Sequence, residues 1–163
     1  MSSPVTLREP AGRVSPRAPI VWATGAVFRG LVLGAALVVA TVVAELFTMP
    51  TWGWVAYAAV VIGYAVAMPL YRYRVHRWES TDTAVYTQHG WLNRERRIAP
   101  MSRVQTVDLE QGVVSRMLRL ATVTVTTASA AGPVRIEGLD RDTAERLVDE
   151  LTRRTEAEPG DAT

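Results

Sequence analysis

The sequence has no cysteine and only two histidines. Without cysteine, the chain can form no disulfide, thiolate nucleophile or cysteine-ligated metal site. His76 and His89 stand far apart in sequence, and no carboxylates accompany them at a spacing typical of metal ligands. The sequence therefore predicts neither a metal nor a cofactor.

The common catalytic motifs are missing as well. There is no glycine-rich phosphate loop and no G-x-S-x-G nucleophile turn. Ser102, His76 and Asp108 are the residue types of a hydrolase triad, but any chain of this length contains such a set. We expect a protein that is not an enzyme.

Charge is nearly absent from one long stretch. All 18 basic residues are arginine, and none lies between Gly30 and Tyr71, where Glu45 is the only charge. One helix over this stretch would be about 63 Å long, twice the ~30 Å of a hydrocarbon core. Pro50 interrupts it, because proline cannot continue a helix. A transmembrane hairpin over 27–71 is predicted, with helices at about Val27–Phe47 and Trp52–Leu70.

Arginines flank this hairpin at both ends, and the turn carries none. Positive charge marks the cytoplasmic side of a span. We therefore expect a two-span protein of the cell membrane with both termini in the cytoplasm. Glu45, next to the turn, is expected at the solvated interface rather than in a role inside the membrane. The flanking residues are Arg8, Arg13, Arg17, Arg29, Arg72, Arg74 and Arg77.

Small residues recur at every fourth position in both predicted helices. The first helix has Gly30 and Gly34 after Ala26, and the second has Ala59, Gly63 and Ala67. Such ridges let helix backbones approach closely in lipid. Either the two helices pack on each other through these ridges, or one ridge serves another subunit.

The two ends of the chain read as unstructured. Residues 1–26 form a proline- and arginine-rich arm that is expected to be disordered, and 156–163 form a polar tail. A secretory signal is a weaker reading of the arm, because the apolar run is long and a second span follows at once.

A small domain over 72–155 follows the hairpin. Val113–Leu118 is compatible with one helical turn. Ala144, Leu147, Val148 and Leu151 form the apolar stripe of a C-terminal helix. Antiparallel strands closed by one helix predict an α+β barrel or sandwich. The predicted strands are Tyr73–Glu79, Ala84–Thr87, Trp91–Ile98, Val104–Leu109, Thr122–Thr127 and Val134–Glu137.

The run Ile98-Ala99-Pro100-Met101-Ser102-Arg103-Val104-Gln105-Thr106-Val107 resembles the "I-P-x-x-R-I-Q-x-V" segment of bacterial pleckstrin-homology (PH) domains of the YdbS-like type. The resemblance continues through Arg116–Thr122, covers about 73–155, and includes the preceding pair of spans. It implies a PH-like fold: a bent, partly open seven-stranded barrel capped by the C-terminal helix. Six strands are clear in the sequence, and the seventh is expected near Asp108–Gly112.

A basic cluster of Arg94, Arg96, Arg97 and Arg103 lies in this domain, with Arg72, Arg74 and Arg77 near the membrane. Juxtamembrane arginines attract anionic lipid, although ordinary solvated side chains are an equally simple reading. PH domains that bind phosphoinositides use a basic loop between their first two strands. The matching loop, 79–83, is acidic here. The arginines lack an aromatic stacking array, so no nucleic acid is expected.

These observations favour a non-enzymatic module at the cytoplasmic face that binds or assembles a protein partner. A related PH-domain membrane protein is one candidate partner. The alternative is that the PH-like domain binds or senses anionic lipid headgroups through its arginines.

Overall fold

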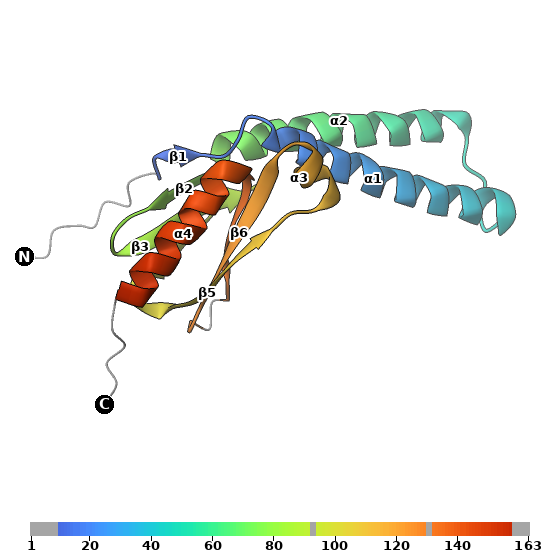
Figure 1. The fold of residues 1–163 in the computed structure, drawn as a ribbon. Helices are drawn as coiled ribbons and strands as arrows, with labels where there is room; N and C mark the ends of the chain where they lie inside the picture. Colours follow the sequence, from blue (N-terminus) through green and yellow to red (C-terminus); the bar gives the residue numbers. More distant parts are fainter. Residues whose placement is uncertain (1–9, 92–93, 130–131, 158–163) are drawn as a thin grey trace, which may run out of the picture.

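The computed structural model of the chain describes residues 10–91, 94–129 and 132–157. A long helical hairpin projects from a small domain made of two β-sheets and a C-terminal helix (Figure 1). Both ends of the hairpin lie at the domain, so the chain leaves the domain and returns to it.

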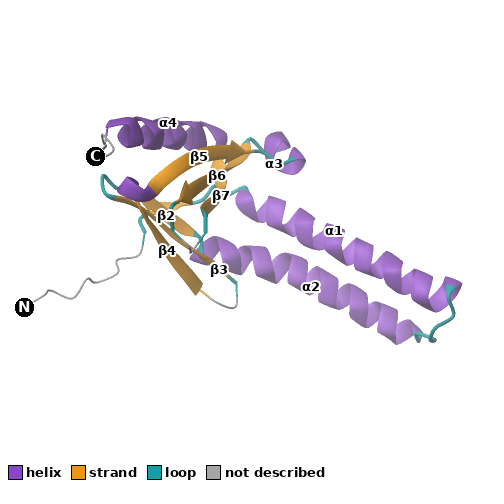
Figure 2. Cartoon of the chain, turned by 90° about the horizontal axis from the view of Figure 1, so that it is seen from below, coloured by secondary structure: helices purple, strands orange, loops and turns teal. Residues whose placement is uncertain are grey.

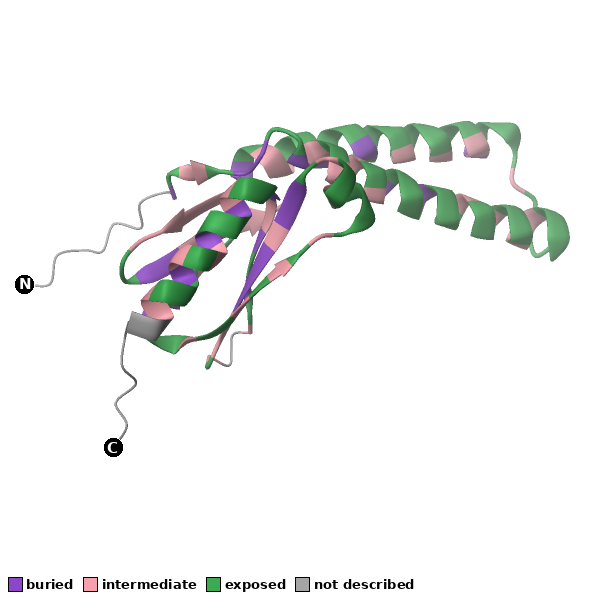
Figure 3. Cartoon of the chain, in the orientation of Figure 1, coloured by how far each residue is buried: buried purple, intermediate pink, exposed green. Residues whose placement is uncertain are grey.

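The hairpin consists of α1, Ala18–Val38, its π-helical continuation η1, Val39–Val43, and α2, Thr51–Val75. Pro50 is the N-cap of α2 with an extended backbone, as its ring geometry requires. Ala18–Val43 and Thr51–Val75 are each long and apolar enough to cross a membrane. Most of their side chains are exposed (Figure 3), and many of these exposed side chains are apolar.

Both helices extend beyond their predicted bounds at the end next to the domain, whereas the first ends at Val43 rather than Phe47. The first begins at Ala18 rather than Val27, and the second ends at Val75 rather than Leu70. Pro19 lies at the start of α1, where its missing N–H costs nothing. Each helix therefore continues past the apolar stretch into the domain.

The domain contains two antiparallel sheets. One has the order β1-β2-β3-β4 and the other β5-β6-β7. The chain passes from one sheet to the other through η2, Met101–Arg103. The strands are β1 Gly12–Arg13, β2 Arg77–Ser80, β3 Ala84–Gly90, β4 Arg94–Pro100, β5 Val104–Glu110, β6 Leu120–Thr127 and β7 Val134–Asp140.

The C-terminal helix α4, Arg141–Ala157, packs against the β5-β6-β7 sheet (Figure 2). Its predicted stripe is correct: Ala144, Leu147 and Leu151 are buried, and Val148 packs beside them. They close a core with Val123 and Val125 of β6 and the apolar faces of the neighbouring strands. This arrangement is the expected α+β, PH-like fold, with the described strands paired in two sheets.

The first strand comes from the N-terminal arm, before the hairpin. Gly12 pairs with Trp78 and Arg13 with Arg77, so β1 extends the first sheet. Val14 and Ala18 are buried next to it. The expected disorder over 1–26 is therefore wrong for the ordered part of the arm, while 1–9 lie outside the described residues.

Two strand predictions also need correction. Tyr73–Val75 are the last turn of α2, so the strand predicted over Tyr73–Glu79 is confined to Arg77–Ser80. The expected seventh strand near Asp108–Gly112 is not separate, because Asp108 and Glu110 belong to β5. In the described ranges the seventh strand is β1, supplied by the arm.

Candidate functional site

The hairpin and the domain meet at a joint centred on Trp22 of α1. Trp22 is buried in a cluster with Ala18, Ala26, Ala65 and Met68. Its ring lies 5.3 Å from that of His76, which follows α2. The joint therefore combines apolar groups from both helices with His76, the residue that follows α2.

Arg72 connects this joint to the second sheet. Its guanidinium carbon lies 4.5 Å from the centroid of the Trp22 ring, a cation–π geometry. Its Nη2 atom lies 2.7 Å from Oε2 of Glu137 on β7. Both charged side chains are partly buried, which makes the pair stronger than an exposed one. Arg72, expected only to flank the membrane, thus joins α1, α2 and β7.

The N-terminal arm also contacts strand β7. The backbone N–H of Ser15 donates to the Gly138 carbonyl at 2.8 Å, and the Ser15 hydroxyl donates to Asp140 at 2.8 Å. Gly138 has a positive φ of 74°, and a Cβ there would lie 2.5 Å from Cβ of Ala18. Glycine is required at this position both by the backbone and by the close approach of α1.

His76 is buried in the joint and uncharged at neutral pH. Burial, and after it the positive charge of Arg72, lowers the pKa of His76 from 6.5 to about 3. The ring of His89 on β3 lies 5.9 Å away, although the sequence suggested no relation between the two histidines. Among the described residues, no group of three or more potential ligands surrounds them to hold a metal.

The predicted basic cluster is divided by the alternation of β4. Arg94 and Arg96 point to one face of the strand and Arg97 to the other. Arg97 is bonded to Glu95 at 2.6 Å and to the Pro133 carbonyl at 3.2 Å. Arg103 lies in η2, beyond the end of β4.

Arg94 and Arg96 lie instead at the end of α2. Arg96 donates to Gln88 at 2.8 Å, and Gln88 donates to the Val75 carbonyl at 3.1 Å. A pocket of about 180 Å³ there is lined by Tyr71, Arg74, Val75, Arg77, Gln88 and Arg94. Three guanidinium groups and a phenol around one hollow are suited to an anion such as a phosphate. The charge pattern grouped all of these arginines, and the β3–β4 register shows that Arg94 is the one of the predicted four that lines this pocket with Arg74 and Arg77.

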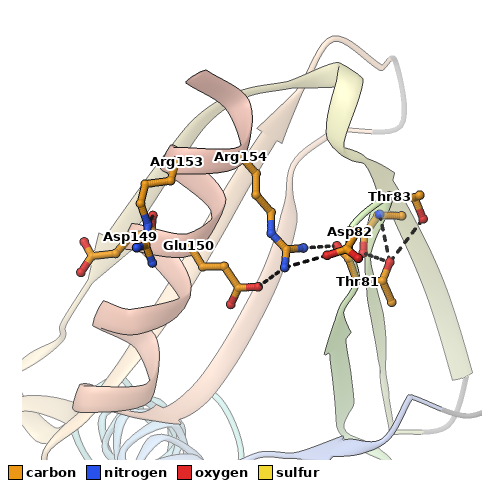
Figure 4. A network of polar contacts seen from close by, with 8 residues as sticks. Thr81, Asp82, Thr83, Asp149, Glu150, Arg153 and Arg154 are labelled. Carbon is orange, nitrogen blue, oxygen red and sulfur yellow. Dashed lines mark hydrogen bonds and ion pairs between the residues drawn. The ribbon is translucent and has the colours of Figure 1, made fainter. Parts of the chain in front are cut away.

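The acidic loop after β2 is held by α4 rather than left open. Arg154 donates to the Thr81 carbonyl at 2.5 Å and pairs with Asp82 at 2.9 Å (Figure 4). Glu150, one turn earlier on α4, also contacts Arg154 at 2.5 Å. Within the described residues, this loop presents carboxylates and not a basic anion site.

The two small-residue ridges of the hairpin differ in what they face. A Cβ on Gly30 would lie 2.5 Å from Val61, and one on Gly34 would lie 3.3 Å from Tyr57. The Tyr57 hydroxyl also donates to the Gly30 carbonyl. The ridge of α1 therefore packs against α2.

The ridge of α2 faces away from α1. Ala59, Gly63 and Ala67 are exposed, and a Cβ on Gly63 would meet nothing within 4 Å. Gly63 lies about 200° around the helix from Val61, at roughly 100° per residue. Of the two readings of the ridges, mutual packing holds for α1 alone, and the α2 ridge is left without a partner in the described chain.

Comparison with known proteins gives two matches. A family model described as bacterial PH domain matches residues 26–155. Transmembrane protein YdbS of Bacillus subtilis (strain 168) is 30% identical over 149 residues, which cover 89% of this chain and 92% of that protein. No solved structure matches the chain significantly.

Proposed function

The chain belongs to the bacterial PH domain family, and from this premise we propose that it is a membrane-anchored, non-enzymatic assembly module. In this proposal the hairpin crosses the membrane twice and the PH-like domain lies on the cytoplasmic face. The partner is another membrane protein, and a related PH-domain protein is one candidate.

The orientation is supported by charge and by connectivity. Seven arginines flank the apolar stretch of the hairpin, and the connecting turn has none. Both ends of the hairpin are fixed to the same domain, so an even number of spans is required for this arrangement. A reporter fused at either terminus is expected to report cytoplasm, and a tag inserted at Thr51 to report the outside. A signal of opposite sides from the two termini would contradict two spans.

The observation that carries the assembly proposal is the exposed ridge of α2. In lipid, helices associate through close packing of small residues, since no hydrophobic effect separates them from the acyl chains. Ala59, Gly63 and Ala67 offer such a surface on the side opposite α1. The contacts of Trp22 and Arg72 at the joint would pass the position of a bound partner on to the domain.

Purification of the tagged full chain from native membranes tests this proposal. A discrete partner should co-purify with the natural chain and be lost with Ala59→Leu or Ala67→Leu. Ala36→Leu is the matched control, because Ala36 is exposed on α1 and is not part of either ridge. A chain that purifies alone, or a partner that all three variants retain, would contradict the proposal.

The pocket at Arg74, Arg77 and Arg94 favours a second candidate function, the binding of anionic lipid headgroups. Tyr71 places this pocket at the membrane end of the domain, where each arginine near the surface contributes about 1 kcal/mol toward anionic lipid. The full chain in nanodiscs should retain anionic lipid more strongly than zwitterionic lipid. Arg94→Glu should reduce this preference, and Arg103→Glu, outside the pocket, should not. Equal effects of the two substitutions would mean that the lipid preference comes from nonspecific charge attraction and not from this pocket.

A further inference from the structure

Among the described residues of the domain, the short helix α3, Val113–Met117, carries the most exposed large apolar side chains. Val113 is 81% exposed and Met117 is 80% exposed, and Val114 between them is 37% exposed. Single exposed apolar residues are ordinary on a protein surface, but three on one five-residue helix are a patch. Nothing in the described part of the chain covers Val113 or Met117.

This patch lies beside the first half of α1 (Figures 1 and 2). A groove of about 850 Å³ separates the two helices, with Ile20, Val27, Phe28 and Leu31 on one side and Val113 and Val114 on the other. Phe28 and Leu31 are 67% and 66% exposed and belong to a helix long enough to cross a membrane. The lipid-facing surface of α1 therefore continues into the groove and onto α3.

The position of the groove along the hairpin matches that expected for the membrane–water interface. Gly30 faces Val61 and Gly34 faces Tyr57 in the antiparallel hairpin. Each step forward along α1 therefore corresponds to an equal step back along α2. On this basis Val27 on α1 is level with Tyr64 on α2, and Ile20 is level with Tyr71.

Trp91, which follows β3, packs edge-on against both tyrosines. The ring centroids are 6.3 Å apart for Tyr64 and 5.1 Å apart for Tyr71. Tryptophan and tyrosine gather where hydrocarbon meets the headgroups. The aromatic group on α2 and the groove on α1 thus lie at one level.

The length of the helix gives the same level independently. A hydrocarbon core takes about 20 helical residues. Counted back from the turn after Val43, these residues reach about Gly25. The residues before it, from Ile20 on, then lie among the inner headgroups, and α3 lies beside them.

We propose that α3 inserts Val113 and Met117 into the inner leaflet and that phospholipid acyl chains fill the groove between α3 and α1. A short apolar helix seated at the headgroup–acyl boundary is a known mode of interfacial binding. Arg116, exposed on the same helix, suits the phosphates above it. This second attachment fixes the tilt of the domain on the membrane. It rests on the proposed orientation of the hairpin in the membrane, and it does not depend on the proposed partner of α2.

Site-directed spin labelling tests the insertion, and the natural absence of cysteine makes it direct. Val113→Cys and Met117→Cys are labelled in the full chain in phospholipid nanodiscs. The accessibility of the nitroxide to oxygen, which concentrates in lipid, is compared with its accessibility to a water-soluble nickel chelate. Val32→Cys, exposed on α1, is the lipid control, and Thr106→Cys, exposed on β5, is the water control.

The proposal expects oxygen accessibility to exceed chelate accessibility at Val113 and Met117, as at Val32, with the reverse ratio at Thr106. High chelate accessibility at both α3 positions would place the helix in water and overturn the proposal. Low accessibility to both reagents would mean that protein covers α3, such as a second copy, and would overturn it as well.

Discussion

Trp22 makes several of the contacts that hold the hairpin to the domain. It is 7% exposed and contacts both the guanidinium of Arg72 and the ring of His76. A tryptophan near the start of an apolar helix is commonly read as an interfacial anchor. Here it packs α1 against the end of α2, next to the contact of Ala18 with β7.

At His76, stability should depend on pH. Its pKa is lowered from 6.5 to about 3 in the folded chain, so the folded state binds fewer protons than the unfolded state between these values. Stability is complete above pH 6.5 and is lost as the pH falls toward 3, by at most about 1.4 kcal/mol per pH unit. Thermal unfolding in detergent at a series of pH values measures this loss. His76→Phe should flatten the dependence, and an unchanged slope would assign the loss to other groups.

At Gly138, an added methyl group should be costly. Gly138→Ala meets a positive φ and a contact of 2.5 Å with Ala18. We expect a loss of about 2 kcal/mol or more, from left-handed backbone strain together with overpacking. Gly112→Ala is the matched control, because a Cβ there meets nothing within 4 Å. Equal melting temperatures for the two variants would contradict the close packing of α1 on β7.

Substitutions in the two ridges of the hairpin should have different effects on the stability of the chain. Gly30→Leu places a side chain against Val61, where a Cβ alone would be 2.5 Å away, and should destabilise the isolated chain by about 1–3 kcal/mol. Gly63→Leu projects away from α1 and should leave that stability unchanged. Thermal unfolding of both variants in detergent compares them directly. A loss at Gly63 as large as that at Gly30 would mean that the helices pack differently.

The elements that the sequence predicted are those specified by local signals. Pro50 marks the hairpin turn, and the stripe from Ala144 to Leu151 marks α4. The strand β1 has no such signal, because it is two residues long and its partner Trp78 lies beyond the whole hairpin. The prolines around β1 indicated disorder, although Pro19 in fact lies in the first turn of α1.

The candidate site was predictable only in part, for the same reason. Charge spacing identified the arginines that flank the membrane, but a strand places successive side chains on opposite faces. The pairing of Gln88 with Arg96 decides that Arg94 joins Arg74 and Arg77 while Arg97 turns toward Pro133. This information lies in the tertiary register, which spacing in one sequence does not contain.

At the scale of the whole molecule, the hairpin is inserted into the domain rather than attached before it. The domain takes β1, Val14 and the start of α1 from one side of the hairpin and everything after α2 from the other. The isolated fragment 73–163 therefore lacks buried residues of its own fold.

This fragment should be markedly less stable than a chain in which a flexible linker replaces residues 27–70. The linked chain keeps the buried Val14 and Ala18 of the arm, and burial of one large apolar side chain contributes roughly 1.5–3 kcal/mol. Urea unfolding followed by circular dichroism compares the two. Equal midpoints would show that the arm is dispensable.

We propose that this membrane-anchored PH-like protein assembles with a protein partner through the exposed ridge of α2, and photo-crosslinking in living cells can detect that partner at the ridge itself. A photoreactive amino acid is placed at Ala59, Gly63 or Ala67 in turn, and at Ala36 as the exposed control. We expect one discrete protein adduct from the α2 positions and none from Ala36. Lipid adducts alone at all four positions would contradict it.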